Sequence, residues 1–192
     1  MEIYFATNNS RKVASLQRDL EKHNVSIIQC PLDLIEPRSS DVKEIASAKI
    51  QQAYKIIQNP TVVVDAGFYI DCLNGFPGAF VNFALETIGL EGILNLVKEK
   101  PRNCEFRECL AYMDTKLSGP IFFSANVKGM LFDEPRGTIQ PHLWSKLGLI
   151  FIPEGSQKTA GEMTFDEYTE WRKISREKNS LGRQLYEWIS KR

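Results

Sequence analysis

The sequence predicts a mixed α/β fold in which a central sheet is flanked by helices. Short β-branched segments alternate with amphipathic segments over roughly the first 100 residues, which is the pattern of strand–helix–strand units. A hairpin pattern follows at residues 105–132, and two helical segments end the sequence. Because a domain typically has roughly 100–200 residues, we expect the 192 residues to form a single domain, 1–192.

The first part of the chain reads as three strands and two helices. The expected strands are 3–6, 26–30 and 61–64, and the expected helices are 11–23 and 42–56. Apolar residues recur at helical spacing in the first helix, and Asp41 with Glu44 resembles a capping box at the start of the second. The continuous β-branched run before Asp65 is typical of a central strand buried on both faces, which we expect to end at residues 65–67.

The second part begins with a turn-rich loop at 74–78 and a predicted helix at 82–98. Two strands, 105–114 and 120–132, are joined by a short polar connection and should form a hairpin. Thr164 with Glu167 resembles a second capping box and opens a charged helix. A last amphipathic helix carries apolar residues at helical spacing: Leu181, Leu185, Trp188 and Ile189.

The charge balance excludes some classes of partner. Lys and Arg number 24, as do Asp and Glu, whereas a protein that binds nucleic-acid polymers normally has a basic excess. A small phosphorylated ligand stays open, because a pocket needs only local charge. No apolar run approaches the roughly 20 residues that cross a bilayer, and MEIYFAT at the N-terminus lacks a signal-peptide pattern. We expect no membrane association and a cytoplasmic location with reduced cysteines.

The loop before the first helix is a candidate phosphate site. Thr7, Asn8 and Asn9 place a hydroxyl and backbone N–H groups at a helix N-terminus, and Lys12 adds positive charge one turn later. A capped helix with a solvated lysine explains the same residues. The local pattern leaves both interpretations open.

Two carboxylates are candidate metal ligands. Aspartate is depleted in strands and costly to bury, so Asp65 after a Val-Val-Val run indicates either chemistry at a strand end or N–H bonds from the next turn. Glu36, in an otherwise apolar turn, can hold Mg²⁺ or be an ordinary exposed acid. Lys178 and Arg183 lie near the start of the last helix, where the helix dipole disfavours cations unless an anion is close; the alternative is a solvated helix face.

Motifs spread over almost the whole chain resemble those of the inosine triphosphate pyrophosphatase family, which acts on non-canonical purine nucleoside triphosphates. Each motif alone is weak, but seven occur in the family's order. They are T-N-N-S-R-K at 7–12, D-L-I-E at 33–36, A-K-I-Q-Q-A at 48–53, V-D-A-G at 64–67, G-F-P-G-A-F at 75–80, F-I-P through K-T-A-G-E-M at 151–163, and K-N with Arg183 at 178–183. The resemblance implies a mixed sheet flanked by helices, two lobes and a deep substrate cleft.

The chain departs from the family's pattern at three places. Val64 stands where the family has the first acid of a pair, which we expect to weaken metal binding and to make Asp65 a poorer base. The residues S-K-L-G-L at 145–149 replace the base-reading F-G-[YW]-D-P, although Trp144 stands beside them. The closing S-H-R lacks its histidine and reads S-L-G-R at 180–183. The triphosphate-handling side is therefore kept in part, and the base-reading side is rebuilt.

The resemblance implies a Mg²⁺-dependent hydrolysis of a nucleoside triphosphate to a monophosphate and pyrophosphate, with Mn²⁺ able to substitute and with altered base specificity. Glu36 and Asp65 would bind the metal, and Asp65 and Lys49 would be the catalytic residues. Phosphate and nucleotide binding would fall to Thr7, Asn9, Lys12, Lys178, Arg183 and Trp144. The family also implies a small nucleotide as the partner and a homodimer. The alternatives are a nucleotide-binding relative with little or no catalytic activity and a structural protein that kept only the fold.

Overall fold

The computed structural model describes residues 1–143 and 145–192, with side chains for all of these except 176–179. The strands are β1 (Glu2–Ala6), β2 (Ser26–Cys30), β3 (Thr61–Ile70), β4 (Pro77–Gly78), β5 (Asn103–Met113), β6 (Ile121–Leu131) and β7 (Phe151–Pro153). They form one sheet in the order β2-β1-β3-β5-β6-β7, and β4 pairs with β3. Because β1 is parallel to both β2 and β3 while β6 and β7 are antiparallel, the sheet is mixed.

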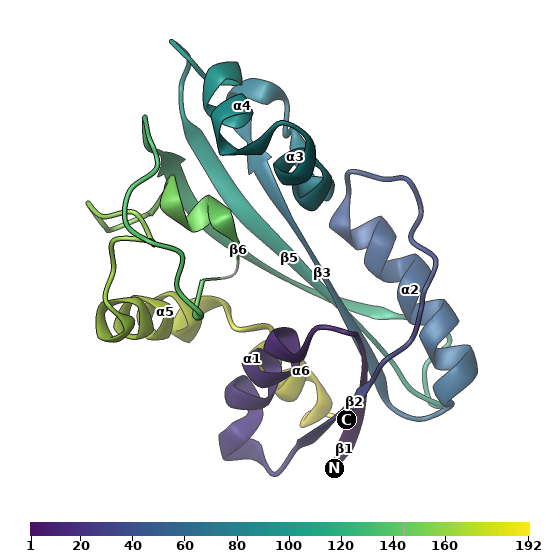
Figure 1. Ribbon diagram of the computed structural model, residues 1–192. Coiled ribbons are helices and arrows are strands. Elements are labelled where there is room, and N and C mark those ends of the chain that lie inside the picture. Colours follow the sequence, from purple (N-terminus) through teal and green to yellow (C-terminus); the bar gives the residue numbers. More distant parts are fainter. Residues whose placement is uncertain (144) are drawn as a thin grey trace. The chain divides into compact units, whose positions relative to one another are not determined.

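The helices lie against this sheet (Figure 1). They are α1 (Ser10–Leu20), α2 (Val42–Ile57), α3 (Val81–Thr87), α4 (Gly89–Leu96), α5 (Phe165–Asn179) and α6 (Leu181–Ile189), with short 3₁₀ turns η1 (Glu21–His23), η2 (Asp71–Leu73) and η3 (Lys146–Leu149). The predicted mixed α/β class, with a central sheet flanked by helices, is confirmed. None of the helices described is long and apolar enough to span a membrane.

The chain divides into two compact units. The first consists of Met1–Ala66, Glu108–Ala125 and Asn179–Arg192, and the second of Gly67–Arg107 and Asn126–Lys178. Strands β3, β5 and β6 contribute residues to both units, since the unit boundaries fall inside them.

The first unit has a core between α1, α6 and one face of the sheet. Leu16 and Leu20 of α1 and Leu185 of α6 pack with Val62 and Val64 of β3, and all five are buried. Helix α2 covers the opposite face of the strands (Figure 1) and buries its own apolar stripe. Strand β3 is thus covered on both faces in this unit, as its β-branched run predicts.

The second unit is built around the other halves of the long strands. Phe68 and Ile70 of β3 pack with Ile93 of α4 and Phe151 of β7. The Phe68 and Phe106 ring centroids lie 4.7 Å apart. A smaller cluster joins the segment before η3 to the start of α5; its buried members are Leu143, Ala160, Met163 and Tyr168.

The prediction that the central strand ends at residues 65–67 is wrong, because β3 continues to Ile70. Gly67 is not a turn residue. A Cβ at this position would lie 2.8 Å from the carbonyl oxygen of Gly78, in the short strand β4 that pairs with β3 next to it. The glycine therefore permits a close approach of two strands.

The predicted helix at 82–98 is divided into α3 and α4. Gly89 has φ +65°, a left-handed backbone conformation that a continuous right-handed helix cannot contain. Apolar residues recur at helical spacing both before and after Gly89, so periodicity alone does not reveal the break between the two helices.

The two predicted capping boxes differ. Thr164 and Glu167 form both reciprocal bonds, at 2.9 and 3.2 Å, so this box is confirmed. Asp41 caps α2 through the Lys43 N–H at 2.8 Å, but the Glu44 carboxylate accepts the Ser39 hydroxyl at 2.6 Å. Because the Asp41 N–H donates to Ser39 Oγ at 3.0 Å, this serine takes the place that Glu44 would have in a box.

Helix α6 packs closely against α1 at Gly182. A Cβ on Gly182 would lie 2.5 Å from the Cβ of Asp19 and 3.3 Å from side-chain atoms of Leu16 and Leu20. Gly182→Ala should therefore lower the free energy of unfolding by about 1–3 kcal/mol, seen as a lower midpoint in urea unfolding. Gly119→Ala is the control, since no described heavy atom lies within 4 Å of its added Cβ. Equal midpoints for the two variants would contradict the prediction.

Candidate active site

Lys49 joins two carboxylates in the first unit. Its Nζ donates to Glu36 Oε1 at 2.8 Å and to Asp65 Oδ1 at 3.0 Å. Lys49 comes from α2, Asp65 from β3, and Glu36 from the extended segment between β2 and α2. The structure therefore brings together three of the residues that the motifs single out.

The charges of this group stabilise one another. Asp65 is buried, with 8% of its surface exposed, whereas the Glu36 side chain is 57% exposed. Burial by itself would lower the pKa of Lys49, but the carboxylates of Asp65 and Glu36 outweigh it and hold the pKa of this ammonium above its ordinary value. Lys49 is consequently a fixed cation at neutral pH.

Lys12 lies near the same group, but none of the bonds described for its side chain goes to a carboxylate. Its Nζ donates to the backbone carbonyl of Val64 at 2.7 Å. Burial lowers the pKa of Lys12 below its ordinary value; the charge of Asp65 opposes this shift, and that of Lys49 adds to it. An anion placed beside Lys12 would stabilise its charged form.

The position of Asp65 follows from the register of β1 and β3. Tyr4 pairs with Thr61 and Phe5 with Val62, and β1 ends at Ala6, so Asp65 lies beyond the carboxyl end of β1. In α/β sheets this is where ligands bind. The predicted placement of Asp65 at the end of its own strand is wrong, because β3 continues to Ile70; Asp65 instead lies beyond the end of the neighbouring strand β1.

The two neighbouring positions 64 and 65 face opposite sides of the sheet, as alternation in a strand requires. The Val64 side chain belongs to the core formed with α1 and α6, while Asp65 contacts Lys49 of α2. A carboxylate at position 64 would therefore point to the α1 face. The negative charge that the family's pattern has at position 64, and that this chain lacks, would therefore lie on the face of the sheet where Lys12 is.

The loop from Thr7 to Asn9 forms a cap on α1. Asn9 Oδ1 accepts the N–H groups of Arg11 and Lys12 at 3.0 and 3.3 Å, and Thr7 Oγ1 accepts the Asn9 N–H at 3.1 Å. The cap of the alternative interpretation is therefore present, but its solvated lysine is not, because Lys12 is half-buried and donates to the Val64 carbonyl. The cap also fixes the start of the helix that carries Lys12.

The remaining candidate residues, Arg183, Lys178 and Trp144, have no described bond to the Glu36–Lys49–Asp65 group. Arg183 is exposed in the first turn of α6, where its Nε donates to Glu187 Oε1 at 2.7 Å. Lys178 falls in the last turn of α5, three residues before α6 begins. The Lys178 side chain and the whole of Trp144 lie outside the described part of the structure.

The carboxylates of Glu36 and Asp65 suit a hard divalent cation whose other coordination positions are filled by water and a phosphate ligand. Asp65 Oδ2 is buried and has no hydrogen-bond partner within the described structure, while Oδ1 is held by Lys49. No group of three or more His, Cys, Asp or Glu residues suited to a metal occurs among the residues described. Mg²⁺ is commonly bound through one or two carboxylates, with water and substrate phosphates completing its coordination. Glu36 and Asp65 match that requirement.

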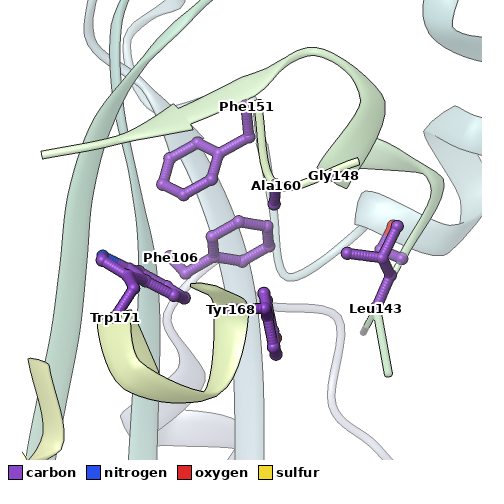
Figure 2. Close-up of a pocket in the computed structure, with 8 residues that line it drawn as sticks. Phe106, Leu143, Gly148, Phe151, Ala160, Tyr168 and Trp171 are labelled. Carbon is purple, nitrogen blue, oxygen red and sulfur yellow. The ribbon is translucent and has the colours of Figure 1, made fainter. Parts of the chain in front are cut away.

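A narrow, mostly apolar pocket lies within the second unit (Figure 2). Tyr168 and Trp171 of α5 line it together with Phe151 of β7 and Phe106 of β5, whose ring centroids are 5.0 Å apart. Its other lining residues are Leu143, Ser145, Gly148 and Ala160. Ser145 and Gly148 belong to the segment that replaces the family's base-reading motif.

These features define a mixed α/β protein with carboxylates and lysines gathered beyond a strand end, a site suited to a phosphate group and a divalent cation. The chain belongs to the Ham1 family, whose model matches residues 3–182, and this confirms the resemblance seen in its motifs. It is 32% identical over 191 residues to a dITP/XTP pyrophosphatase of Methanopyrus kandleri, with 98% of this chain and 96% of that protein covered.

Other relatives agree with this assignment. The chain is 34% identical over 168 residues to a dITP/XTP pyrophosphatase of Saccharolobus solfataricus, which covers 87% of this chain and 84% of that protein. A HAM1 protein from Coxiella burnetii has the same fold, with a TM-score of 0.81 over the full length of both chains at 24% identity.

Proposed function

We propose that this protein hydrolyses a nucleoside triphosphate between its α- and β-phosphates, so that water is consumed and a nucleoside monophosphate and pyrophosphate are released. The observation that carries the proposal is the Glu36–Lys49–Asp65 group beyond the end of β1, with Lys12 nearby. Relatives that match nearly the whole chain carry the name dITP/XTP pyrophosphatase, which supports the same reaction class.

In this reaction the carboxylate of Asp65 acts on water and the lysines bind phosphate. Asp65 orients the attacking water and accepts its proton. Lys49 and Lys12 hold phosphate oxygens and stabilise the negative charge that develops on the pyrophosphate leaving group. The cap made by Thr7 and Asn9 fixes the helix that carries Lys12. Lys178, Arg183 and Trp144 remain predicted contacts to the nucleotide.

Glu36 and Asp65 would hold Mg²⁺, or Mn²⁺ in its place, because hard carboxylate oxygens suit both ions. When bound, the ion supplies positive charge that offsets the charge of the phosphates. The exposed Glu36 side chain and the open Asp65 Oδ2 support this assignment.

We propose that base specificity differs from that of relatives with F-G-[YW]-D-P. A site rejects a wrong base strongly only where it presents polar groups to that base. The aspartate of that motif is replaced by Gly148, which lines the apolar pocket of the second unit (Figure 2). The loss of this aspartate removes one polar group by which a base could be read.

Three broader expectations also stand as proposals. Residues 1–192 act as one domain, the protein works as a homodimer, and it acts on small nucleotides in the cytoplasm. The family match over 3–182 supports the first of these, because it extends across both units.

A triphosphate panel tests the activity. We expect pyrophosphate release from at least one member of a set of canonical and deaminated purine and pyrimidine triphosphates, in the presence of Mg²⁺ or Mn²⁺ and not with a chelator. The reason is that the lysines alone do not offset the negative charge of a triphosphate beside two carboxylates, so a divalent cation is required. A coupled pyrophosphate assay provides the measurement and also identifies the preferred base.

The same panel discriminates the alternatives. Nucleotides that raise the melting temperature without any pyrophosphate release would favour a binding protein with little or no catalysis. A result with no pyrophosphate release and no thermal shift would favour a structural protein.

A further inference from the structure

The backbone of the segment that carries Glu36 is held by the side chain of Gln52. The Ile35 N–H donates to Gln52 Oε1 at 3.0 Å, and Gln52 Nε2 donates back to the Ile35 carbonyl at 2.8 Å. The same Nε2 also donates to the carbonyl of Ala48 at 3.1 Å, which orients the amide. Gln52 thus forms a two-way bond with the residue immediately before Glu36.

The bond matters because Ile35 and Glu36 are not themselves fixed by apolar packing, although Leu32 and Leu34 of the same segment are half-buried. Residues 31–41 form no helix or strand, and Ile35 is 79% exposed. The Glu36 side chain is 57% exposed, so its position depends on where its backbone is held. Polar bonds to the backbone are then a constraint at this point of the segment, and Gln52 supplies two of them at a single residue.

Helical spacing couples this constraint to the site. Gln52 follows Lys49 by three residues on α2, so the two side chains lie on one face of the helix. Lys49 binds the Glu36 carboxylate while Gln52 binds the adjoining backbone. One turn of α2 therefore sets both the charge partner and the backbone position of Glu36.

We propose that Gln52 is a positioning residue, which holds the Ile35 backbone so that the Glu36 carboxylate stays directed at the metal position beside Asp65. This inference rests on the proposed function for its effect on turnover. Gln52 itself contacts neither metal nor substrate. Loss of a group that orients a metal ligand commonly costs 10–100-fold in metal affinity, and we expect about 10-fold here because Asp65 remains in place.

The test compares Gln52→Met with Gln51→Met. Both remove an amide from α2, but Gln51 is exposed and makes none of the bonds to Ile35. We expect Gln52→Met to weaken Mn²⁺ binding in the absence of nucleotide about 10-fold, measured from the electron paramagnetic resonance of free Mn²⁺. It should also speed hydrogen exchange of the Ile35 amide, and Gln51→Met should leave both values at those of the unmodified protein.

A third arm asks whether Gln52 acts through Glu36. In a Glu36→Gln background, Gln52→Met should weaken Mn²⁺ binding no further. Equal weakening in both backgrounds would overturn the inference, because it would show a general structural effect. If Gln52→Met does not fold, Gln52→Glu replaces it: this variant keeps the acceptor for the Ile35 N–H and loses the donor to the carbonyl.

The arms without nucleotide separate this inference from the proposed function. Mn²⁺ binding and amide exchange need no turnover, so they decide the role of Gln52 even if no triphosphate is hydrolysed. Gln52→Met and Gln51→Met with the same Mn²⁺ affinity would overturn the inference, as would an unmodified protein that binds no Mn²⁺. If the protein is active, Gln52→Met should raise the Mg²⁺ concentration for half-maximal activity while kcat at saturating Mg²⁺ stays within about twofold.

Discussion

Asp65→Asn should reduce the rate of pyrophosphate release by at least about 100-fold, the lower end of what loss of a general base costs. The amide has nearly the shape of the carboxylate and can still accept the Lys49 bond seen at 3.0 Å. It cannot take a proton from water, and it binds a divalent cation far less well than a carboxylate. Steady-state assays at saturating Mg²⁺ with the best triphosphate of the panel provide the measurement.

The control for this variant is Asp71→Asn. Asp71 is exposed and directly follows the end of β3, so the exchange tests the same chemistry outside the site. We expect it to leave the rate unchanged, and both variants should unfold at temperatures close to that of the unmodified protein. Substantial activity in Asp65→Asn would exclude Asp65 as the base and would require another residue in that role.

Lys49→Met should have two opposite effects. Turnover should fall about 10- to 100-fold, because a cation that holds phosphate is lost. Mn²⁺ binding without nucleotide should become at least about 10-fold tighter, because a unit charge in contact with both carboxylates is removed and close charges interact by several kcal/mol even at a protein surface. Calorimetric titration of the nucleotide-free protein with Mn²⁺ measures the second effect.

The physical reason is competition between two cations. The Lys49 Nζ lies 2.8 Å from Glu36 Oε1 and 3.0 Å from Asp65 Oδ1, and its positive charge there repels a divalent ion bound by the same two carboxylates. Lys55→Met, an exposed lysine on the same helix, is the control and should change neither quantity. Weaker Mn²⁺ binding in Lys49→Met would contradict the competition and would mean that Lys49 organises the carboxylates for the metal.

Much of the fold follows from local pattern, and the exceptions have identifiable causes. Strand β2 begins and ends at the predicted residues, and the cap of α5 has both predicted bonds, because adjacent residues determine them. The end of β3 does not follow from local pattern. Glycine is typical of turns, so Gly67 predicts a strand end. The close approach of β4, eleven residues later at Gly78, explains why a glycine stands inside the strand.

The motifs predict which residues are candidates for the site, but not how their side chains are arranged. The motifs singled out Glu36, Lys49 and Asp65, but nothing local indicates that one ammonium lies between the two carboxylates. The bond from Lys12 to the Val64 carbonyl joins residues 52 positions apart, beyond any periodicity. Gln52 was missed for the same reason, and its spacing of three residues from Lys49 is the signal that could have found it.

The contact between Gly182 and α1 has a consequence for protein engineering. A designer who wished to repair the closing motif would put histidine at position 182, but the Cβ alone would lie 2.5 Å from that of Asp19. The packing of α6 against α1 therefore disfavours any side chain at this position, and a histidine more than the alanine of Gly182→Ala.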